Sequence, residues 1–286
     1  MTTSLESVGS HIQANGMRLH LQTMRATTAD GSAAGGRDGK RETIVLIHGL
    51  LTDSLASYYF TLGPGLAEAG FDVVMYDLRG HGRSERPYAG YRLDDFTTDL
   101  VALLDSLGLD QPVHLVGNSF GGAIGFAVAA AHPTRVASVI AIEAQPPVES
   151  WLGQMKVGFE DAVTWLPDDN VINYIAEVAS PHTARLCRKA WGVMQRTDIA
   201  ADIMSSDVLD DSLPGLRCPV LALTGSETGM AKEYLKLSRN LDDWKVVVMP
   251  EQGHSVLIER SQETLEYITA WVGGEYAEHA SASSAA

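Results

Sequence analysis

Apolar residues form short continuous runs that alternate along the chain with segments of helical periodicity. Runs of β-branched and aliphatic residues bounded by turn residues predict strands that are buried on both faces. Strands that alternate with helices imply crossover connections, so the sequence predicts an α/β fold with a mostly parallel central sheet and helices on both faces. The predicted strands are 43–47, 71–76, 113–116, 136–142, 219–224 and 245–249, and the predicted helices are 55–69, 93–107, 122–131, 230–241 and 260–272.

Three other segments depart from this alternation. Residues 11–25 surround Asn15-Gly16, a dipeptide favoured in two-residue hairpin turns, so we expect two short antiparallel strands there. Residues 26–41 are small, polar and glycine-rich and predict a flexible loop. Residues 275–286 are rich in Ala and Ser and predict a disordered tail.

The alternation also breaks between residues 145 and 214, where several helical segments follow one another without a strand-like run. Helices inserted into an α/β array do not extend its sheet. They most simply cover the carboxyl edge of the strands, where open α/β sheets bind ligands. The sequence therefore predicts a core of residues 1–144 and 215–274, and a helical lid (cap) domain of residues 145–214 inserted after the sixth strand.

Charge and composition narrow the classes of partner. The chain has 286 residues, with 21 Lys and Arg against 36 Asp and Glu, and this net charge of −15 disfavours nucleic acids and anionic membrane surfaces. Two cysteines without motif spacing argue against a disulfide framework or a zinc cluster and favour a reducing compartment. Residues 1–10 lack the features of a signal peptide, so we expect a cytoplasmic protein. The oligomeric state stays open, with a homodimer as one alternative.

The most informative motif is the run Gly-Asn-Ser-Phe-Gly-Gly at 117–122, between a predicted strand and a predicted helix. A serine at such a sharp turn, with glycines two positions before and after it, is the signature of a nucleophile elbow. The following helix presents free N–H groups and its positive dipole end to an anion formed there. Ser119 is therefore the predicted nucleophile.

Together with this elbow, three further motifs resemble those of the α/β-hydrolase family, in the same order and at similar spacing: Ile-His-Gly-Leu at 47–50, Asp-Leu-Arg-Gly-His-Gly-Arg-Ser at 77–84, and Gln-Gly-His-Ser at 252–255. The resemblance spans residues 43–273 and implies the α/β-hydrolase fold. It makes His254 the general base and the backbone N–H groups of Leu50 and Phe120 the oxyanion hole. The 77–84 motif resembles a structural turn whose charges are solvated or tie loops together.

The acid that orients the histidine is absent from its usual place. In most members of this family it is an aspartate three residues after the glycine that ends the penultimate strand; here that glycine is Gly225 and the position holds Thr228. Glu143 ends the predicted strand 136–142 and is the preferred candidate, because a charge closing a buried strand is costly unless it is paired. Glu227 and an acid from elsewhere, or none, remain as alternatives. Zearalenone-type lactonases and polyether-releasing thioesterases, which this chain resembles in that respect, use a glutamate at the end of this strand.

These residues favour acyl transfer: attack on a carbonyl, an acyl-enzyme, and hydrolysis by water. Together with the resemblance, they predict a serine hydrolase that cleaves an ester, lactone or thioester of a bulky, apolar, polyketide-like acid, a small-molecule substrate. Trp165 and Trp191, with Met155, Phe159 and Met194, are candidates for lining an apolar pocket, although such residues more often form the buried faces of lid helices. No metal or organic cofactor is expected, because no ligand cluster or dinucleotide fingerprint is evident.

Two alternatives stay open. The elbow closely resembles that of carbon–carbon bond hydrolases for ring-cleavage products, although those enzymes keep the aspartate that Thr228 replaces and often carry a tryptophan where Ser255 stands. The other alternative is a non-catalytic hydrolase-fold receptor, which the same threonine motivates.

Overall fold

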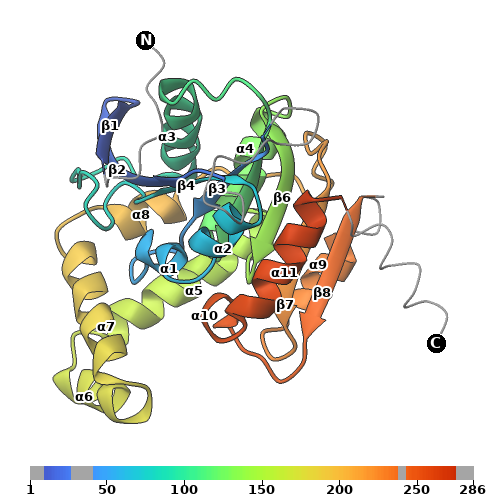
Figure 1. Ribbon diagram of the computed structural model, residues 1–286. Coiled ribbons are helices and arrows are strands. Elements are labelled where there is room, and N and C mark those ends of the chain that lie inside the picture. Colours follow the sequence, from blue (N-terminus) through green and yellow to red (C-terminus); the bar gives the residue numbers. More distant parts are fainter. Residues whose placement is uncertain (1–9, 27–40, 238–242, 275–286) are drawn as a thin grey trace.

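The computed structural model describes residues 10–26, 41–237 and 243–274, and its centre is one eight-stranded sheet (Figure 1). The strands lie in the order β1-β2-β4-β3-β5-β6-β7-β8. All pairs from β4 to β8 are parallel, whereas β1 and β2 form an antiparallel hairpin whose second strand also pairs antiparallel with β4. The strands are β1 (Ser10–Ala14), β2 (Met17–Met24), β3 (Thr43–Ile47), β4 (Asp72–Tyr76), β5 (Val113–Asn118), β6 (Val136–Ile142), β7 (Val220–Gly225) and β8 (Trp244–Met249).

The first hairpin turns at the dipeptide that the sequence indicated. Asn15 and Gly16 have φ angles of 51° and 72°, the left-handed conformation that a two-residue hairpin turn requires at both central positions. The predicted loop 26–41 lies outside the described residues except for Ala26 and Arg41, and the predicted tail 275–286 lies entirely outside them.

Helices cover both faces of the sheet, and for this reason the sequence of β3 is apolar throughout. Val45 and Ile47 belong to the core beneath α3 and α4, while Ile44 and Leu46 belong to the core beneath α1, α2, α10 and α11. Because successive side chains of a strand point to opposite faces, a sheet with two cores needs apolar residues at every position. The helices are α1 (Ala56–Tyr59), α2 (Gly63–Glu68), α3 (Leu93–Ser106), α4 (Phe120–Ala131), α9 (Met230–Leu237), α10 (Val256–Glu259) and α11 (Ser261–Val272).

The helix expected at 55–69 is divided in two. Pro64 stands in the first turn of α2, where a missing N–H is tolerated. In the interior of one continuous helix the same proline would remove a hydrogen bond and clash with the preceding turn. The chain therefore ends α1 at Tyr59 and starts again at Gly63.

Four helices follow one another between β6 and β7: α5 (Glu149–Trp165), α6 (Asp169–Val178), α7 (Pro181–Met194) and α8 (Ile199–Met204). In Figure 1 the arrows of β6 and β8 run toward the side of the molecule on which α5, α6 and α7 lie. Trp151 of α5 stacks on Phe120, the first residue of α4, with ring centroids 6.1 Å apart, which joins the first of these helices to the core. We call residues 145–214 the helical insertion.

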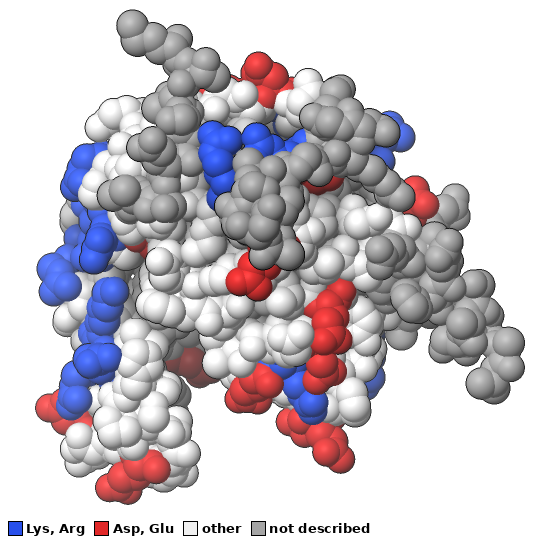
Figure 2. All heavy atoms as spheres, in the orientation of Figure 1, with Lys and Arg blue, Asp and Glu red and all other residues white. Residues whose placement is uncertain are grey.

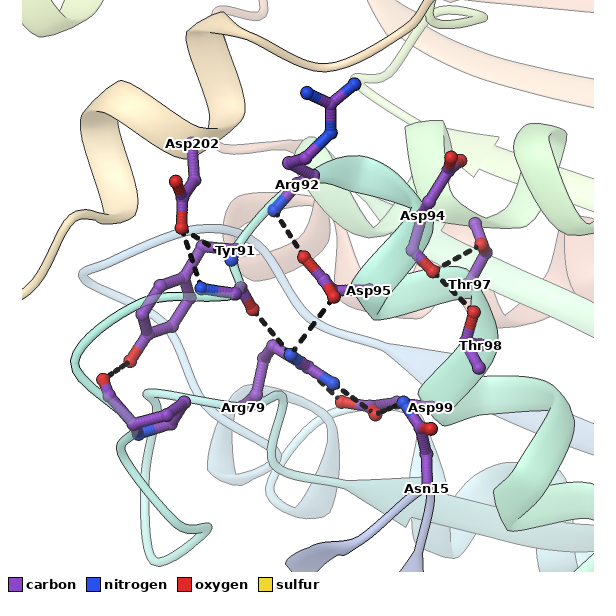
Figure 3. A network of polar contacts seen from close by, with 12 residues as sticks. Asn15, Arg79, Tyr91, Arg92, Asp94, Asp95, Thr97, Thr98, Asp99 and Asp202 are labelled. Carbon is purple, nitrogen blue, oxygen red and sulfur yellow. Dashed lines mark hydrogen bonds and ion pairs between the residues drawn. The ribbon is translucent and has the colours of Figure 1, made fainter.

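A buried polar network fastens the turn after β4 to its surroundings (Figure 3). The guanidinium of Arg79 pairs with Asp99 of α3 through two nitrogens, and Asp99 also accepts a hydrogen bond from Asn15 of the first hairpin. Asp202 of α8 accepts from the N–H groups of Gly90 and Tyr91, 2.7 and 2.9 Å away. The expectation that the charges of this motif tie loops together is thus met by Arg79, which is only 5% exposed rather than solvated.

Candidate active site

The turn between β5 and α4 holds Ser119 in a backbone conformation that serine rarely adopts, with φ 52° and ψ −118°. The neighbouring glycines make this turn sterically feasible. A Cβ added to Gly117 would lie 2.3 Å from the amide nitrogen of Gly122, and one added to Gly121 would lie 2.0 Å from the carbonyl oxygen of Ile47. The hydroxyl of Ser119 consequently stands at the end of the strand, half-buried, facing the loop that follows β8.

That loop brings His254 to the serine. Its Nε2 lies 3.3 Å from Ser119 Oγ, and its Nδ1 lies 3.1 Å from Oε2 of Glu143. A ring that donates from Nδ1 to a carboxylate leaves Nε2 as the acceptor for the serine proton. The carboxylate is completely buried, whereas 55% of the histidine side chain is exposed, so the ring is open to a ligand on one side.

Glu143 follows β6 directly and has a φ of 46°, which is uncommon for a residue with a side chain. Its Oε1 accepts a hydrogen bond from the N–H of Gly225, at the end of β7. Thr228, in the position where the aspartate was expected, lies with its hydroxyl 3.5 Å from the same oxygen. The carboxylate that contacts the histidine therefore follows β6 instead of β7. Thr228, which occupies the position after β7, contacts this carboxylate.

Tyr234 is buried next to Glu143. Its hydroxyl donates a hydrogen bond to the carbonyl oxygen of Ala144, the residue after Glu143. Burial, and secondly the negative charge of Glu143, raise the pKa of Tyr234 well above its ordinary value, which keeps the phenol neutral. Glu227, the alternative acid, is exposed, and the hydrogen bonds described for His254 go to Glu143 and Ser119 instead.

The backbone N–H groups of Phe120 and Leu50 have no hydrogen-bond acceptor among the described residues. Phe120 is the first residue of α4, and the first N–H groups of a helix have no partner within it. Leu50 follows β3, and within the described residues no acceptor is bound to its N–H. These are the two N–H groups that were predicted to form the oxyanion hole.

The loop that carries Leu50 is held by a carboxylate that sequence reasoning missed. Asp53 accepts hydrogen bonds from the N–H groups of Gly49 and Ser54, both 2.8 Å away, and its Oδ2 lies 3.4 Å from Nδ2 of Asn118. One side chain thus contacts both the loop after β3 and the residue that precedes Ser119. The sequence signal was only an aspartate between Thr and Ser in a polar turn, which an ordinary surface loop would also show.

Two buried histidines hold the same loop from the other side, with ring centroids 5.2 Å apart. His81 donates from Nδ1 to the carbonyl oxygen of Arg79 and accepts at Nε2 from the N–H of Leu51, which has a φ of 60°. Burial, and to a smaller extent the nearby His48, lower the pKa of His81 to about 3, so its ring is neutral. His48 accepts at Nε2 from the N–H of Leu78, 3.0 Å away.

Two cavities meet at this site. The first, about 470 Å³, is lined by Ser119 and His254 and has a mixed wall, in which Asp53, Asn118 and His182 stand beside leucine and isoleucine side chains. The second, about 280 Å³, is almost entirely apolar and shares Leu50 and Thr52 with the first. Its remaining wall comes mainly from the helical insertion: Gln154, Met155, Gly158, Phe159, Ala162, Leu166, Cys187 and Ala190.

Of the five aromatic and methionine side chains proposed to line an apolar pocket, two do so. Met155 and Phe159 of α5 line the apolar cavity. Trp165 is 55% exposed, and Trp191 of α7 is half-buried; neither these two nor Met194 lines either of the two cavities. Helical periodicity identified the apolar faces of α5 and α7 but did not reveal which residues face the cavity.

No three His, Cys, Asp or Glu side chains of residues 10–26, 41–237 and 243–274 are grouped so as to hold a metal ion. None of the helices within these ranges has the length and apolar character needed to cross a membrane. Cys187 and Cys218 are both free thiols.

Comparison with known proteins agrees with the fold. The family model of the alpha/beta hydrolase fold matches residues 42–170. A non-heme chloroperoxidase of Streptomyces lividans is 40% identical over 79 residues, 28% of this chain and 29% of that protein. A putative carbamate hydrolase RutD of Caulobacter sp. (strain K31) is 26% identical over 280 residues, 89% of this chain and 100% of that protein.

Among solved structures, the enol-lactonase from Burkholderia xenovorans LB400 is similar, with a TM-score of 0.67 and 22% identity. The similarity covers 92% of this chain and 100% of the lactonase chain. It extends across the helical insertion as well as the sheet, whereas the family-model match ends at residue 170. The strand order, the family-model match and the structural similarity together show that this chain is an α/β-hydrolase fold protein.

Proposed function

We propose that the protein is a serine hydrolase that cleaves an ester, lactone or thioester of a bulky apolar acid through an acyl-enzyme. One observation carries this proposal: a hydrogen-bonded chain from Ser119 Oγ through the ring of His254 to the buried carboxylate of Glu143. A serine hydroxyl is a weak nucleophile at its free pKa and needs such a base within reach. Serine at the elbow leaves this chain without the carboxylate nucleophile that ester-forming dehalogenases and epoxide hydrolases use.

In the first half of the reaction, Ser119 Oγ bonds to the carbonyl carbon while its proton moves to His254 Nε2. Glu143 stabilises the imidazolium that forms, and the N–H groups of Leu50 and Phe120 donate to the carbonyl oxygen as it becomes an anion. The tetrahedral intermediate then expels the alkoxide or thiolate, which takes the proton from His254. In a lactone the expelled alcohol stays attached to the acyl group.

In the second half, water attacks the acyl-enzyme and gives one proton to His254 Nε2. The tetrahedral intermediate collapses to the free acid, and Ser119 recovers its proton from His254. The exposure of this ring on the cavity side supports access for water. The enzyme is regenerated without any external oxidant, reductant or cofactor.

The two cavities support the substrate class. An acyl chain bound to Ser119 passes Leu50 and Thr52 into the apolar cavity, while the leaving group lies on the side of the cavity that contains His254 and His182. Burial of a chain of aliphatic carbons there is favourable by about 0.8 kcal/mol per methylene. Residues 145–214 would act as a lid, because α5 and α7 supply most of that cavity's wall. The similar enol-lactonase makes lactones a reasonable part of the test panel.

Labelling with a fluorophosphonate tests the proposal. The intact protein should form a covalent adduct at Ser119, and the Ser119→Ala variant should form none. Mass measurement of acyl-enzymes trapped from a panel of macrolactones, aryl esters and acyl thioesters would then identify the acyl group. Absence of labelling with tight retention of an apolar ligand would favour a receptor, and release of a coloured dienoate with inert esters and lactones would favour a carbon–carbon bond hydrolase.

A further inference from the structure

A third cavity, of about 650 Å³, lies beside the active-site cavity and differs from it in charge. Arg83, from the turn after β4, and Lys189, from α7, form two of its walls. Figure 2 shows Lys and Arg side chains gathered along the left edge of the molecule, the edge along which Figure 1 places this turn and α7. The other lining residues are His20, Gln22, Ser54, Leu55, Ala56, Tyr59, Phe60, Asp77 and Gly82.

The two cations are not matched by acids. Neither Arg83 nor Lys189 forms an ion pair with any residue in the described ranges. The carboxylate in the wall, Asp77, is 2% exposed and already accepts from His20 and from the N–H groups of Leu55 and Arg83. Two exposed cations against this one buried carboxylate leave the wall with a net positive charge, which in a chain of net charge −15 creates a local potential that attracts anions.

The same cavity offers apolar surface beside the charges. Phe60 is 80% exposed and Tyr59 is 38% exposed, with their rings edge-to-face at 5.1 Å. Large apolar rings next to two cations suit an organic anion, whose carbon chain covers the rings, better than a bare inorganic ion. The occupant expected from this chemistry is an anionic group on a carbon chain.

Helix α7 spans both this cavity and that of Ser119. His182 and Leu186 line the active-site cavity, and Lys189 lines the cationic one. These residues are four and then three positions apart, so they share one face of the helix. The seven steps from the first to the last correspond to about 10 Å along the helix axis.

The sheet gives a similar spacing. Ser119 follows β5 and Asp77 follows β4, with only β3 between these strands, and two strand spacings are about 10 Å. The segment around the start of α1 contributes to both cavities, since Ser57 lines one and Ser54 and Ala56 line the other. The cationic cavity therefore lies within the reach of a substrate whose carbonyl is at Ser119.

We propose that the cavity at Arg83 and Lys189 binds an anionic group, a carboxylate or a phosphate, at the far end of the substrate's leaving group. This inference rests on the proposed function, and it names the substrate class more closely: esters or thioesters of apolar acids with anionic leaving groups. The acyl chain occupies the apolar cavity, and the leaving group runs beneath α7 to the two cations.

Three matched esters test it in the intact protein. They carry the same acyl group on an eight-carbon alcohol that ends in a carboxylate, a phosphate or a neutral amide. We expect kcat/KM to be roughly tenfold higher for an anionic ester than for the neutral one, from two partly exposed charge pairs. The advantage should shrink as salt is added. A larger gain for the phosphate or for the carboxylate identifies which anion is preferred, and equal values for all three esters would overturn the proposal.

Variants locate the effect. Arg83→Gln with Lys189→Gln should raise the KM of the anionic esters to that of the neutral ester and so remove the anionic preference, while Lys189→Arg should retain it. Lys156→Ala, which removes an exposed charge of α5 outside these cavities, is the matched control. An anionic preference that survives the double substitution contradicts the site.

Binding separates this proposal from the proposed function. The Ser119→Ala variant, which has no nucleophile, should bind 8-hydroxyoctyl phosphate or 8-hydroxyoctanoate more tightly than 8-hydroxyoctanamide, as measured by calorimetry. Loss of that difference in the Arg83→Gln, Lys189→Gln background supports the site even if no ester is hydrolysed. Equal binding of all three alcohols rejects it even if Ser119 is labelled by a fluorophosphonate.

Discussion

Glu143 Oε2 lies 3.1 Å from His254 Nδ1, although 111 positions separate the two residues in the chain. The contact exists because β6 and β7 are parallel neighbours, with the N–H of Glu143 donating to the carbonyl oxygen of Leu223. The glutamate thereby reaches the edge of the sheet over which the loop after β8 passes. A carboxylate buried completely at that point has the histidine as its ionisable partner.

Replacing this carboxylate tests its role. In Glu143→Gln the amide no longer stabilises the imidazolium or favours the productive tautomer, and we expect kcat to fall on the order of 10⁴-fold. Glu227→Gln alters an exposed acid of the neighbouring turn and should leave kcat near that of the unsubstituted protein. Steady-state kinetics of both variants, with circular dichroism to verify folding, decide the matter. The reverse ranking would transfer the role to Glu227.

Asp53 is expected to act as a positioning residue for the oxyanion hole. In Asp53→Asn an amide group replaces one carboxylate oxygen, so the N–H of Gly49 or of Ser54 loses its acceptor and the loop carrying Leu50 loosens. Loss of one oxyanion donor costs about 10²–10³ in kcat, and partial misplacement should cost about tenfold to a hundredfold.

The readout is the division between kcat and KM. We expect kcat to fall, KM to change little, and affinity for a boronic acid that mimics the tetrahedral intermediate to fall in parallel with kcat. Ser57→Ala, which removes one hydroxyl bound to the same carboxylate, is the milder comparison. Unchanged boronate affinity in Asp53→Asn would show that Asp53 does not position the donor.

Gly158 offers a way to shorten the apolar cavity. It lines that cavity from α5, and a Cβ added there would meet no other atom within 4 Å. The backbone at this position therefore accepts a side chain, and the leucine of Gly158→Leu is expected to occupy part of the cavity, while replacing a glycine inside a helix favours the fold by about 0.5–1 kcal/mol. Hydrolysis of long-chain esters should fall at least tenfold, and that of acetyl esters should persist.

The matched control is Gly153→Leu. Gly153 also belongs to α5 and has the same free space around it, but it does not line the apolar cavity. Chain-length profiles of kcat/KM for a series of aryl esters give the comparison. Equal profiles for the two variants would show that the acyl chain does not enter this cavity.

His81 gives a prediction for stability against pH. Its pKa is about 3 in the folded chain and 6.5 for a free histidine, so between these values the unfolded state binds a proton that the folded state excludes. The free energy of unfolding should therefore fall as the pH drops below 6.5, by up to about 1.4 kcal/mol per pH unit, and this loss ends near pH 3.

Urea unfolding at pH 7 and pH 5 measures this contribution. In His81→Gln the amide oxygen can still accept from Leu51 N–H, and the loss of stability between the two pH values should be smaller by about 2 kcal/mol. His132→Gln removes an exposed histidine and should leave the pH dependence as it was. A pH dependence identical in His81→Gln and the unsubstituted protein would mean that His81 titrates normally in the fold.

Local patterns of the sequence were sufficient for much of the architecture. The strands were predicted within two residues of their observed ends, because a sheet covered on both faces requires apolar residues at every position. The elbow was recognisable because a turn of this shape has no room for a Cβ at Gly117 and Gly121, so glycine is required at both positions. Where a local rule was overlooked the prediction was wrong, as with Pro64, which divides the helix expected at 55–69.

What the sequence alone determined is the fold class and the positions of Ser119, His254 and Glu143 as candidates that follow three different strands of one sheet. Only the tertiary structure decided that Glu143 rather than Glu227 contacts the histidine, that Asp53 and His81 hold the loop of Leu50, and that Met155 rather than Trp165 faces the apolar cavity. Each of these depends on side chains from separate elements meeting in space, and periodicity within one element specifies its buried face but not the neighbour it meets.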